Sequence, residues 1–244
     1  MTEELFREDA TLRECRATVL AHSEAGVILD RTVFYPLGGG QAGDAGALVL
    51  ADGRRVAITE ARKAKEGMEN PGAVLHLLAP GVDRSGLVPG AIVTAQIDWA
   101  RRHRHMRFHT TTHLLCSLVP YPVDGCSITA GYARLDFHMF EPLDKDVLTA
   151  GIARLVAAAH AVRHRWISEA ELDANPGLVR SMSVQPPRGL GRIRVLEIEG
   201  VDLQPCGGTH VANTAEIGAV VVTKIEKKSA MTRRVVLGFA EAPP

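Results

Sequence analysis

The spacing of apolar residues changes at Asp98, and this change constrains the fold more than any other feature of the sequence. Before Asp98, short apolar runs alternate with turn residues, a pattern typical of strands. Asp98 itself can cap a helix that runs from Trp99 to about Val119, where Pro120 ends it. We therefore predict an α+β chain with two domains, residues 1–98 and residues 99–244.

The first domain has the regular succession of strands and turns expected of a small antiparallel β-barrel. Its Asp52-Gly53 pair predicts a hairpin with a type I′ turn, in which both central residues have positive φ. The glycine-rich segment Gly81–Gly90 is expected to be a loop. The expected strands are Cys15–Leu20, Val27–Leu29, Thr32–Tyr35, Ala47–Leu50, Val56–Glu60, Val74–Leu78 and Ile92–Ile97.

The second domain mixes helix and strand signals, which is typical of an α+β domain. A second helix is expected over Asp144–Val162, where apolar residues recur at helical spacing. Strands are expected over Ser127–His138, Arg192–Ile198, Ile217–Ile225 and Arg233–Phe239, the last two as a hairpin.

Composition excludes several classes of protein. With 244 residues, 46% hydrophobic and 23% charged, the chain is neither disordered nor fibrous. No apolar run approaches the roughly 20 residues that cross a bilayer, and the N-terminal MTEELFRED is not expected to be a secretory signal. Four dispersed cysteines suggest reduced thiols or metal ligands and not a disulfide framework. We therefore expect a cytoplasmic protein without a membrane partner.

Charge is distributed unevenly along the chain. The formal net charge is zero, which argues against binding nucleic acid by bulk electrostatics alone. Residues 1–98 nevertheless carry 10 basic against 14 acidic side chains, and residues 99–244 carry 18 against 14. Either this is statistical scatter, or the second half faces an anion.

Two pairs of potential metal ligands stand out. His109 and His113 are four residues apart on the expected helix, so both imidazoles project from one face. Cys206 and His210 are also four apart, across a Gly-Gly pair that lets a loop fold back. Together they would complete a tetrahedral Zn²⁺ site of the Cys-His₃ type.

Other interpretations of these residues remain open. His109 and His113 could be an ordinary surface or core pair, and Cys116, on nearly the same helical face, could be a rival ligand. The leucines around Cys116 instead favour a buried free thiol. His105 is expected to be solvated, because its neighbours are basic.

Several motifs, taken together, resemble those of a known family. MRFHTTTHLL and QPCGGTHVANTAEIG are similar to the metal-binding signature of alanyl-tRNA synthetase editing domains and of the freestanding AlaX-type alanyl-tRNA editing proteins. FYPLGGGQAGDAG, residues 34–46, is similar to the glycine-rich motif of the longer freestanding editors, which carry an N-terminal barrel. ITAGYARLDF and KIEKKSAMTRRVVLGF also match the pattern, so the resemblance covers nearly the whole chain. Thr112 departs from it, since relatives more often have a small or apolar residue there.

The resemblance implies a trans-editing hydrolase. Such an enzyme deacylates mischarged tRNA(Ala), carrying mainly serine and possibly glycine, and needs no nucleotide cofactor. By the same likeness, one Zn²⁺ per chain is bound by His109, His113, Cys206 and His210, which act on the aminoacyl ester through the bound zinc and a water. The alternatives are a non-catalytic tRNA-binding module with a structural zinc and a general metallohydrolase of small esters.

Substrate contacts are expected near the acceptor end of the tRNA. A site that selects serine over alanine needs a polar group to bind the serine hydroxyl, and Thr129 is the candidate by its likeness to the family, although a β-branched strand residue is an equally ordinary interpretation. By the resemblance, Gly39, Gly40 and Gln41 could present N–H and amide groups to the substrate, whereas read alone the glycines indicate a plain barrel turn. Asp44 and Gly46 are expected to shape the turn.

Basic residues suggest where RNA binds. Arg101, Arg102, Arg104 and Arg107 crowd the start of the first expected helix, where cations oppose the helix dipole and phosphates would compensate them. A solvated face paired with acidic residues is the alternative. The segment over residues 184–191 could close over the tRNA end or be a plain connector. Further basic residues that could extend the surface are Arg188, Arg192, Arg194, Lys224, Lys227, Lys228, Arg233 and Arg234.

Overall fold

The computed structural model describes residues 2–67, 70–182, 185–186, 188–189 and 191–240. These residues form two compact units. The first unit runs to Gly38 and resumes over Ala42–His103, and the second holds Gly39–Gln41 and the described chain from Arg104 onward. The short glycine-rich segment therefore leaves the first unit and belongs structurally to the second.

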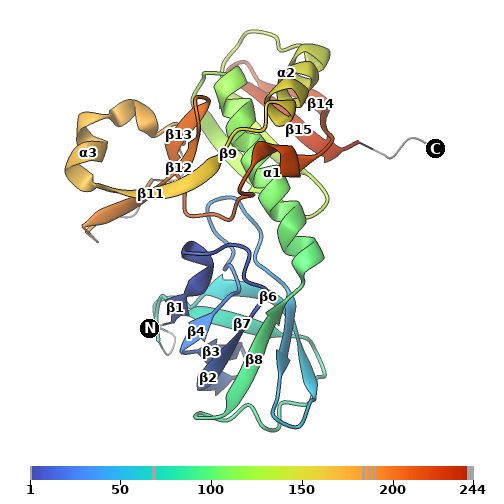
Figure 1. Ribbon diagram of the computed structural model, residues 1–244, viewed down its shortest axis with the longest axis vertical. Coiled ribbons are helices and arrows are strands. Elements are labelled where there is room, and N and C mark those ends of the chain that lie inside the picture. Colours follow the sequence, from blue (N-terminus) through green and yellow to red (C-terminus); the bar gives the residue numbers. More distant parts are fainter. Residues whose placement is uncertain (1, 68–69, 183–184, 187, 190, 241–244) are drawn as a thin grey trace. The chain divides into compact units, whose positions relative to one another are not determined.

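The first unit is a closed six-stranded barrel, as the sequence predicts (Figure 1). Every neighbouring pair is antiparallel, and the interior is filled by apolar side chains such as Val19, Leu48 and Ile58. A short β1 (Glu3–Glu4) pairs in parallel with β4 (Arg31–Thr32), and the 3-10 turn η1 (Leu5–Arg7) follows β1. In barrel order the strands are β2 (Glu14–Ser23), β3 (Gly26–Leu29), β7 (Val74–Leu78), β6 (Arg55–Lys63), β5 (Gly46–Val49) and β8 (Ile92–Ile97).

Two expectations for the barrel are wrong in detail. The strand expected over Thr32–Tyr35 ends at Thr32. The hairpin at Asp52-Gly53 exists, but only Gly53 has a positive φ, of 85°, so the turn is not type I′. Leu50 pairs with Arg54 through Leu50 N–H and Arg54 O at 2.9 Å, which makes a three-residue loop with the glycine at its left-handed position.

The long helix α1 (Trp99–Leu118) begins at the expected cap, since Asp98 Oδ1 accepts a hydrogen bond from Arg101 N at 3.1 Å. From His105 to Cys116 every residue except Arg107 is buried, so this part of α1 is a central helix of the second unit. The expectation that His105 is solvated is therefore wrong. Cys116 is a buried free thiol, as its apolar neighbours predict.

The second unit contains two antiparallel sheets (Figure 1). The four-stranded sheet has the order β14 (Val220–Ser229), β15 (Thr232–Phe239), β10 (Ala133–His138) and β9 (Val123–Ile128). The strand expected over Ser127–His138 is thus two strands, joined by a turn. The three-stranded sheet joins β11 (Val162–Ser168), β12 (Arg192–Ile198) and β13 (Asp202–Pro205).

Shorter helices complete this unit. Asp144 caps α2 (Lys145–Ala157), which packs on β14 and lies so close to α1 that a Cβ at Gly151 would be 2.9 Å from Leu118 Cδ1. The rest of the helix expected over Asp144–Val162 is absent, because the chain turns at Ala158 and enters β11. The remaining elements are α3 (Glu169–Ala174), η2 (Pro176–Leu178) and η3 (Thr214–Ile217). Among the described residues, no helix is both long and apolar enough to cross a bilayer.

Candidate metal centre

Four side chains from two distant stretches of the chain meet in the second unit. His109 and His113 lie on α1, and Cys206 and His210 lie on the loop that follows β13. One ligand atom from each of the four lies within 4.8 Å of the others. Cys206 Sγ is 3.5 Å from His109 Nε2 and 3.2 Å from His210 Nε2. The convergence that the sequence predicts is present.

The loop that carries Cys206 and His210 is held closely against α1. A Cβ at Gly208 would lie 2.1 Å from His109 Cε1, so only glycine fits beneath this ring. The buried guanidinium of Arg194 donates from one nitrogen to Cys206 O at 2.9 Å and to Gly208 O at 3.2 Å. The second glycine of the Gly-Gly pair is therefore needed for space, since its φ is not positive.

Each histidine of the cluster has a separate partner at Nδ1. His109 Nδ1 is 2.8 Å from Gln41 Oε1, and His113 Nδ1 is 2.8 Å from Asp202 Oδ2. The third, His210 Nδ1, is 3.3 Å from Thr110 Oγ1. Because the Nδ1 atoms are engaged outside the cluster, the Nε2 atoms are left to face its centre, an arrangement typical of metal-binding histidines.

The donor set fits a tetrahedral metal ion. One sulfur and three imidazole nitrogens are ligands that Zn²⁺ prefers. With metal–ligand bonds of about 2.3 Å to sulfur and 2.05 Å to nitrogen, a tetrahedron separates sulfur from nitrogen by about 3.6 Å. The two distances from Cys206 Sγ, 3.5 and 3.2 Å, are close to this value. The four residues could therefore hold a metal ion.

The electrostatics of the cluster favour a thiolate. Burial alone would raise the pKa of Cys206, but the imidazoles of His109 and His210 outweigh it and hold the pKa well below its usual value. Burial, with the charge of His109, lowers the pKa of His210. At His113, burial is opposed by the Asp202 and Cys206 hydrogen bonds, which raise the pKa to about 10. The thiolate is the form of cysteine that binds metals.

The glycine-rich segment lies directly beside the donors. Gly39 and Gly40 have φ of 57° and 83°, and Gly40 O accepts a hydrogen bond from Ile128 N at 2.7 Å. Gln41, which also forms an isolated parallel bridge with Ile128, is completely buried. Of the three residues expected to contact substrate here, Gln41 has its amide against His109 of the cluster.

The sequence suggested that Thr129 lies within a strand. In the structure it lies in the turn after β9. Its hydroxyl donates to Tyr132 O at 3.0 Å. The same oxygen accepts from Gly131 N at 3.2 Å and from Tyr132 N at 3.1 Å. One donor and two acceptor positions are all that a hydroxyl has. Thr129 would therefore bind a substrate hydroxyl only by giving up a contact within its own turn.

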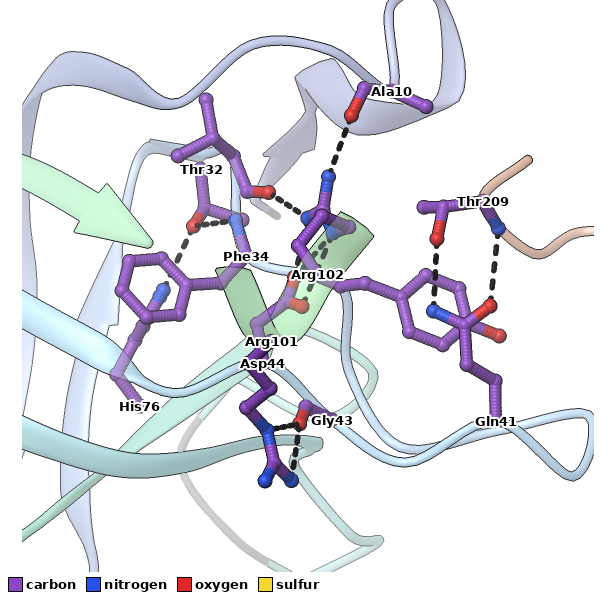
Figure 2. A network of polar contacts seen from close by, with 12 residues as sticks. Ala10, Thr32, Phe34, Gln41, Gly43, Asp44, His76, Arg101, Arg102 and Thr209 are labelled. Carbon is purple, nitrogen blue, oxygen red and sulfur yellow. Dashed lines mark hydrogen bonds and ion pairs between the residues drawn. The ribbon is translucent and has the colours of Figure 1, made fainter. Parts of the chain in front are cut away.

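The first two arginines of the expected RNA surface are engaged in the barrel unit (Figure 2). Arg102 is completely buried and forms an ion pair with Asp44, while Nη1 donates to Ala10 O at 2.9 Å and Nη2 also donates to Val33 O at 2.6 Å. A buried, fully engaged guanidinium cannot reach a phosphate, so the expectation for Arg102 is corrected. Arg101 donates to Gly43 O at 3.2 Å.

The other two arginines form a basic pair in the second unit. The guanidinium carbons of Arg104 and Arg107 lie 4.4 and 4.0 Å from the ring centre of Phe239. Arg104 Nε donates to Ala130 O and Arg107 Nε to Ile217 O. Burial and the adjacent charge of Arg104 lower the pKa of Arg107. Neither has a carboxylate within ion-pair distance among the described residues.

Several of the further basic residues have internal roles. Arg194 braces the Cys206 loop, and Arg234 Nε pairs with Asp136 Oδ1 at 2.7 Å. Arg233 is buried and donates to Phe140 O, whereas Lys227 and Lys228 are exposed. Of residues 184–191, positions 184, 187 and 190 lie outside the described residues, so the expectation for this loop stays a prediction.

The sequence did not predict which residues hydrogen-bond to the cluster histidines and to Gln41 from outside the cluster. Asp202 and Thr110 contact His113 and His210, and Thr209 contacts Gln41. Thr110 and Thr209 are next to candidate ligands in the sequence, within HTTTH and CGGTH, and this position could have indicated that they contact the site. Asp202 had no such indication, because its pairing with His113 spans 89 residues.

The structure is thus that of an α+β protein, in which one unit is a β-barrel and the other carries a Cys-His₃ cluster that could hold a metal ion. Two family profiles match the chain: "Threonyl and Alanyl tRNA synthetase second additional domain" over residues 193–236 and "tRNA synthetases class II (A)" over residues 6–101.

Similar proteins specify the family further. The chain is 34% identical to an alanyl-tRNA editing protein AlaX-M from Saccharolobus solfataricus, over 96% of this chain and 98% of the relative. An AlaX-M from Methanosarcina barkeri is also 34% identical, over 96% and 97%. An alanine–tRNA ligase from Pyrococcus furiosus is 34% identical over 99% of this chain and 26% of the ligase. The chain belongs to the alanyl-tRNA editing protein family, which is similar to the editing region of alanine–tRNA ligases.

Proposed function

We propose that this protein is a trans-editing hydrolase that deacylates mischarged tRNA(Ala), mainly the seryl and possibly the glycyl form. The observation that carries the proposal is the cluster of four ligand atoms within 4.8 Å of one another, in a chain whose AlaX-M relatives match it over nearly their full length. The substrate would be met in the cytoplasm.

The ion that we propose at this cluster is a single Zn²⁺. Bound there, zinc would place a positive charge beside the aminoacyl ester, where it would stabilise negative charge that develops during hydrolysis. His109, His113, Cys206 and His210 would fill all four positions of a tetrahedral shell, and filled shells are usual for structural sites. We therefore favour a role for the ion in positioning the aminoacyl end over direct activation of water.

The RNA would be held in part by the Arg104–Arg107 pair. Two like charges close together are unfavourable, and no acidic side chain of the described chain offsets them. A phosphate would remove this repulsion, and planar guanidiniums bind phosphate through paired hydrogen bonds. We accordingly retain Arg104 and Arg107 as RNA contacts, together with Arg101, and leave out Arg102.

A deacylation assay distinguishes this function from its alternatives. The protein is incubated with labelled seryl-tRNA(Ala), alanyl-tRNA(Ala) and a small seryl ester, and release of the amino acid is followed. We expect rapid loss of serine from the tRNA, slow loss of alanine, and little cleavage of the small ester. Binding of seryl-tRNA(Ala) without release at enzyme excess would identify a binding module with a structural metal. Equal cleavage of the small ester would identify a general esterase.

A further inference from the structure

The amide of Gln41 is engaged at both ends, entirely within the second unit (Figure 2). Its Oε1 accepts a hydrogen bond from Thr209 N at 3.1 Å, and its Nε2 donates to Thr209 Oγ1 at 2.9 Å. Oε1 also lies 2.8 Å from His109 Nδ1. The side chain is fully buried, so no water competes for these contacts.

These contacts determine which way the amide points. A backbone N–H can only donate, so the amide atom that faces Thr209 N must be the oxygen. The same oxygen can only accept, so His109 must carry its proton on Nδ1. The lone pair of His109 is then on Nε2, the atom 3.5 Å from Cys206 Sγ. One backbone group of the loop thus fixes, through Gln41, the tautomer of a metal-site histidine.

The segment around Gln41 is locked in place by close packing. A Cβ at Gly40 would lie 2.9 Å from Cys126 Sγ, and a Cβ at Gly208 would lie 3.0 Å from Gln41 Oε1. Larger side chains at either glycine would push the amide away from His109. The glycines therefore serve the approach of Gln41 to the ring, a role that requires no contact with substrate.

We propose that Gln41 is a positioning residue of the metal centre, which orients His109 and fixes its Nδ1-protonated tautomer, and is not a substrate contact. This rests on the proposed zinc site, but it concerns affinity for the metal and needs no tRNA. Outer hydrogen bonds of this kind are worth about 10–100-fold in metal affinity.

Two substitutions separate orientation from packing. Gln41→Leu keeps the bulk but cannot accept the proton of His109, whereas Gln41→Glu still accepts it. With zinc affinity measured by competition against a chromophoric chelator, we expect Gln41→Leu to bind about 10–100-fold more weakly. Gln41→Glu should stay within a few-fold of the unaltered protein. Gln96→Leu in β8 is the control for loss of a glutamine elsewhere.

A spectroscopic measurement keeps the proposal testable if Gln41→Leu folds poorly. In the unaltered protein loaded with zinc, a long-range ¹H–¹⁵N spectrum should show His109 protonated at Nδ1. Cobalt(II) bound to Gln41→Leu should give altered visible bands, and bound to Gln41→Glu nearly unaltered ones. The proposal is overturned if His109 is protonated at Nε2, or if Gln41→Leu matches the unaltered protein in zinc affinity and cobalt spectrum.

Discussion

His76 shows at the scale of one residue how burial changes a side chain's chemistry. It is completely buried in the barrel, where Nε2 lies 2.8 Å from Thr32 Oγ1 and Nδ1 lies 3.0 Å from Val27 O. Burial lowers the pKa of His76 to about 4, although the hydrogen bond to Val27 opposes the shift. The imidazole is therefore neutral in the folded protein near pH 7.

This pKa predicts how the stability of the barrel depends on pH. Between about pH 6.5 and pH 4 the unfolded chain binds a proton at His76 that the folded chain does not. The free energy of unfolding should fall as pH is lowered through this interval, with roughly 3 kcal/mol of the loss due to His76. Urea unfolding of the unaltered protein and of His76→Gln, measured at several pH values, checks this. An equal pH slope in the variant would refute the prediction.

The sequence predicted the four donors of the cluster but not all of the residues that contact them. These donors could be predicted, because pairs at four-residue spacing stand out in the sequence. Their outer partners could not all be found. Gln41 contacts His109 across 68 residues, and only folding brings such groups together. The burial of Arg102 was missed for the same reason, since Asp44 is 58 residues away.

At the scale of elements, apolar runs bounded by turn residues predicted several strands well. Val74–Leu78 and Ile92–Ile97 have the bounds expected from the sequence. The strand prediction failed at a turn whose one glycine, Gly131, stands within an otherwise strand-like run. The turn between β9 and β10 was read as continuous strand, although its hydrogen bonds come from Thr129.

The Thr129 turn leads to a prediction about selectivity. Because the hydroxyl is used within the turn, Thr129→Val should lower the free energy of unfolding by about 1–2 kcal/mol. The ratio of seryl- to alanyl-tRNA(Ala) hydrolysis should stay within a few-fold of its original value. Steady-state deacylation of both substrates measures this ratio, with Thr223→Val in β14 as a matched control for stability. A collapse of the ratio in Thr129→Val alone would assign the hydroxyl to the substrate.

The basic pair on α1 predicts a change in the salt dependence of RNA binding. Each arginine that contacts a phosphate adds to the slope of log affinity against log salt concentration, by about 0.7–0.9. Replacing Arg104 and Arg107 together by Gln should therefore weaken tRNA(Ala) binding and reduce that slope by about 1.5. Titrations at several salt concentrations provide the slope. Arg163→Gln, an exposed residue of β11, is the control, and a double variant with an unchanged slope would remove the pair from the interface.

For the whole molecule, the important point is that the chain does not divide between its units at one position. Gly39–Gln41 belongs to the second unit although it is flanked on both sides by the barrel sequence. The two-domain description at residue 98 stays a prediction, and a fragment beginning at residue 99 would keep all four donors but lose Gln41.

That fragment tests whether the donors alone make the site. Residues 99–244 should bind zinc about 10–100-fold more weakly than the full chain, because His109 loses its partner at Nδ1. Full-length Gln41→Leu should show a loss of similar size. Chelator competition on both proteins gives the comparison. Full affinity in the fragment would mean that the glycine-rich segment contributes nothing to metal binding.

X-ray absorption at the zinc edge of the purified protein tests the central claim most directly. It should show one zinc per chain, bound by one sulfur at about 2.3 Å and three nitrogens at about 2.0–2.1 Å. In Cys206→Ala the sulfur contribution should disappear together with most of the bound zinc, whereas Cys15→Ala in the barrel should leave both unchanged. A shell without sulfur, or an unchanged zinc content and spectrum in Cys206→Ala, would contradict the account.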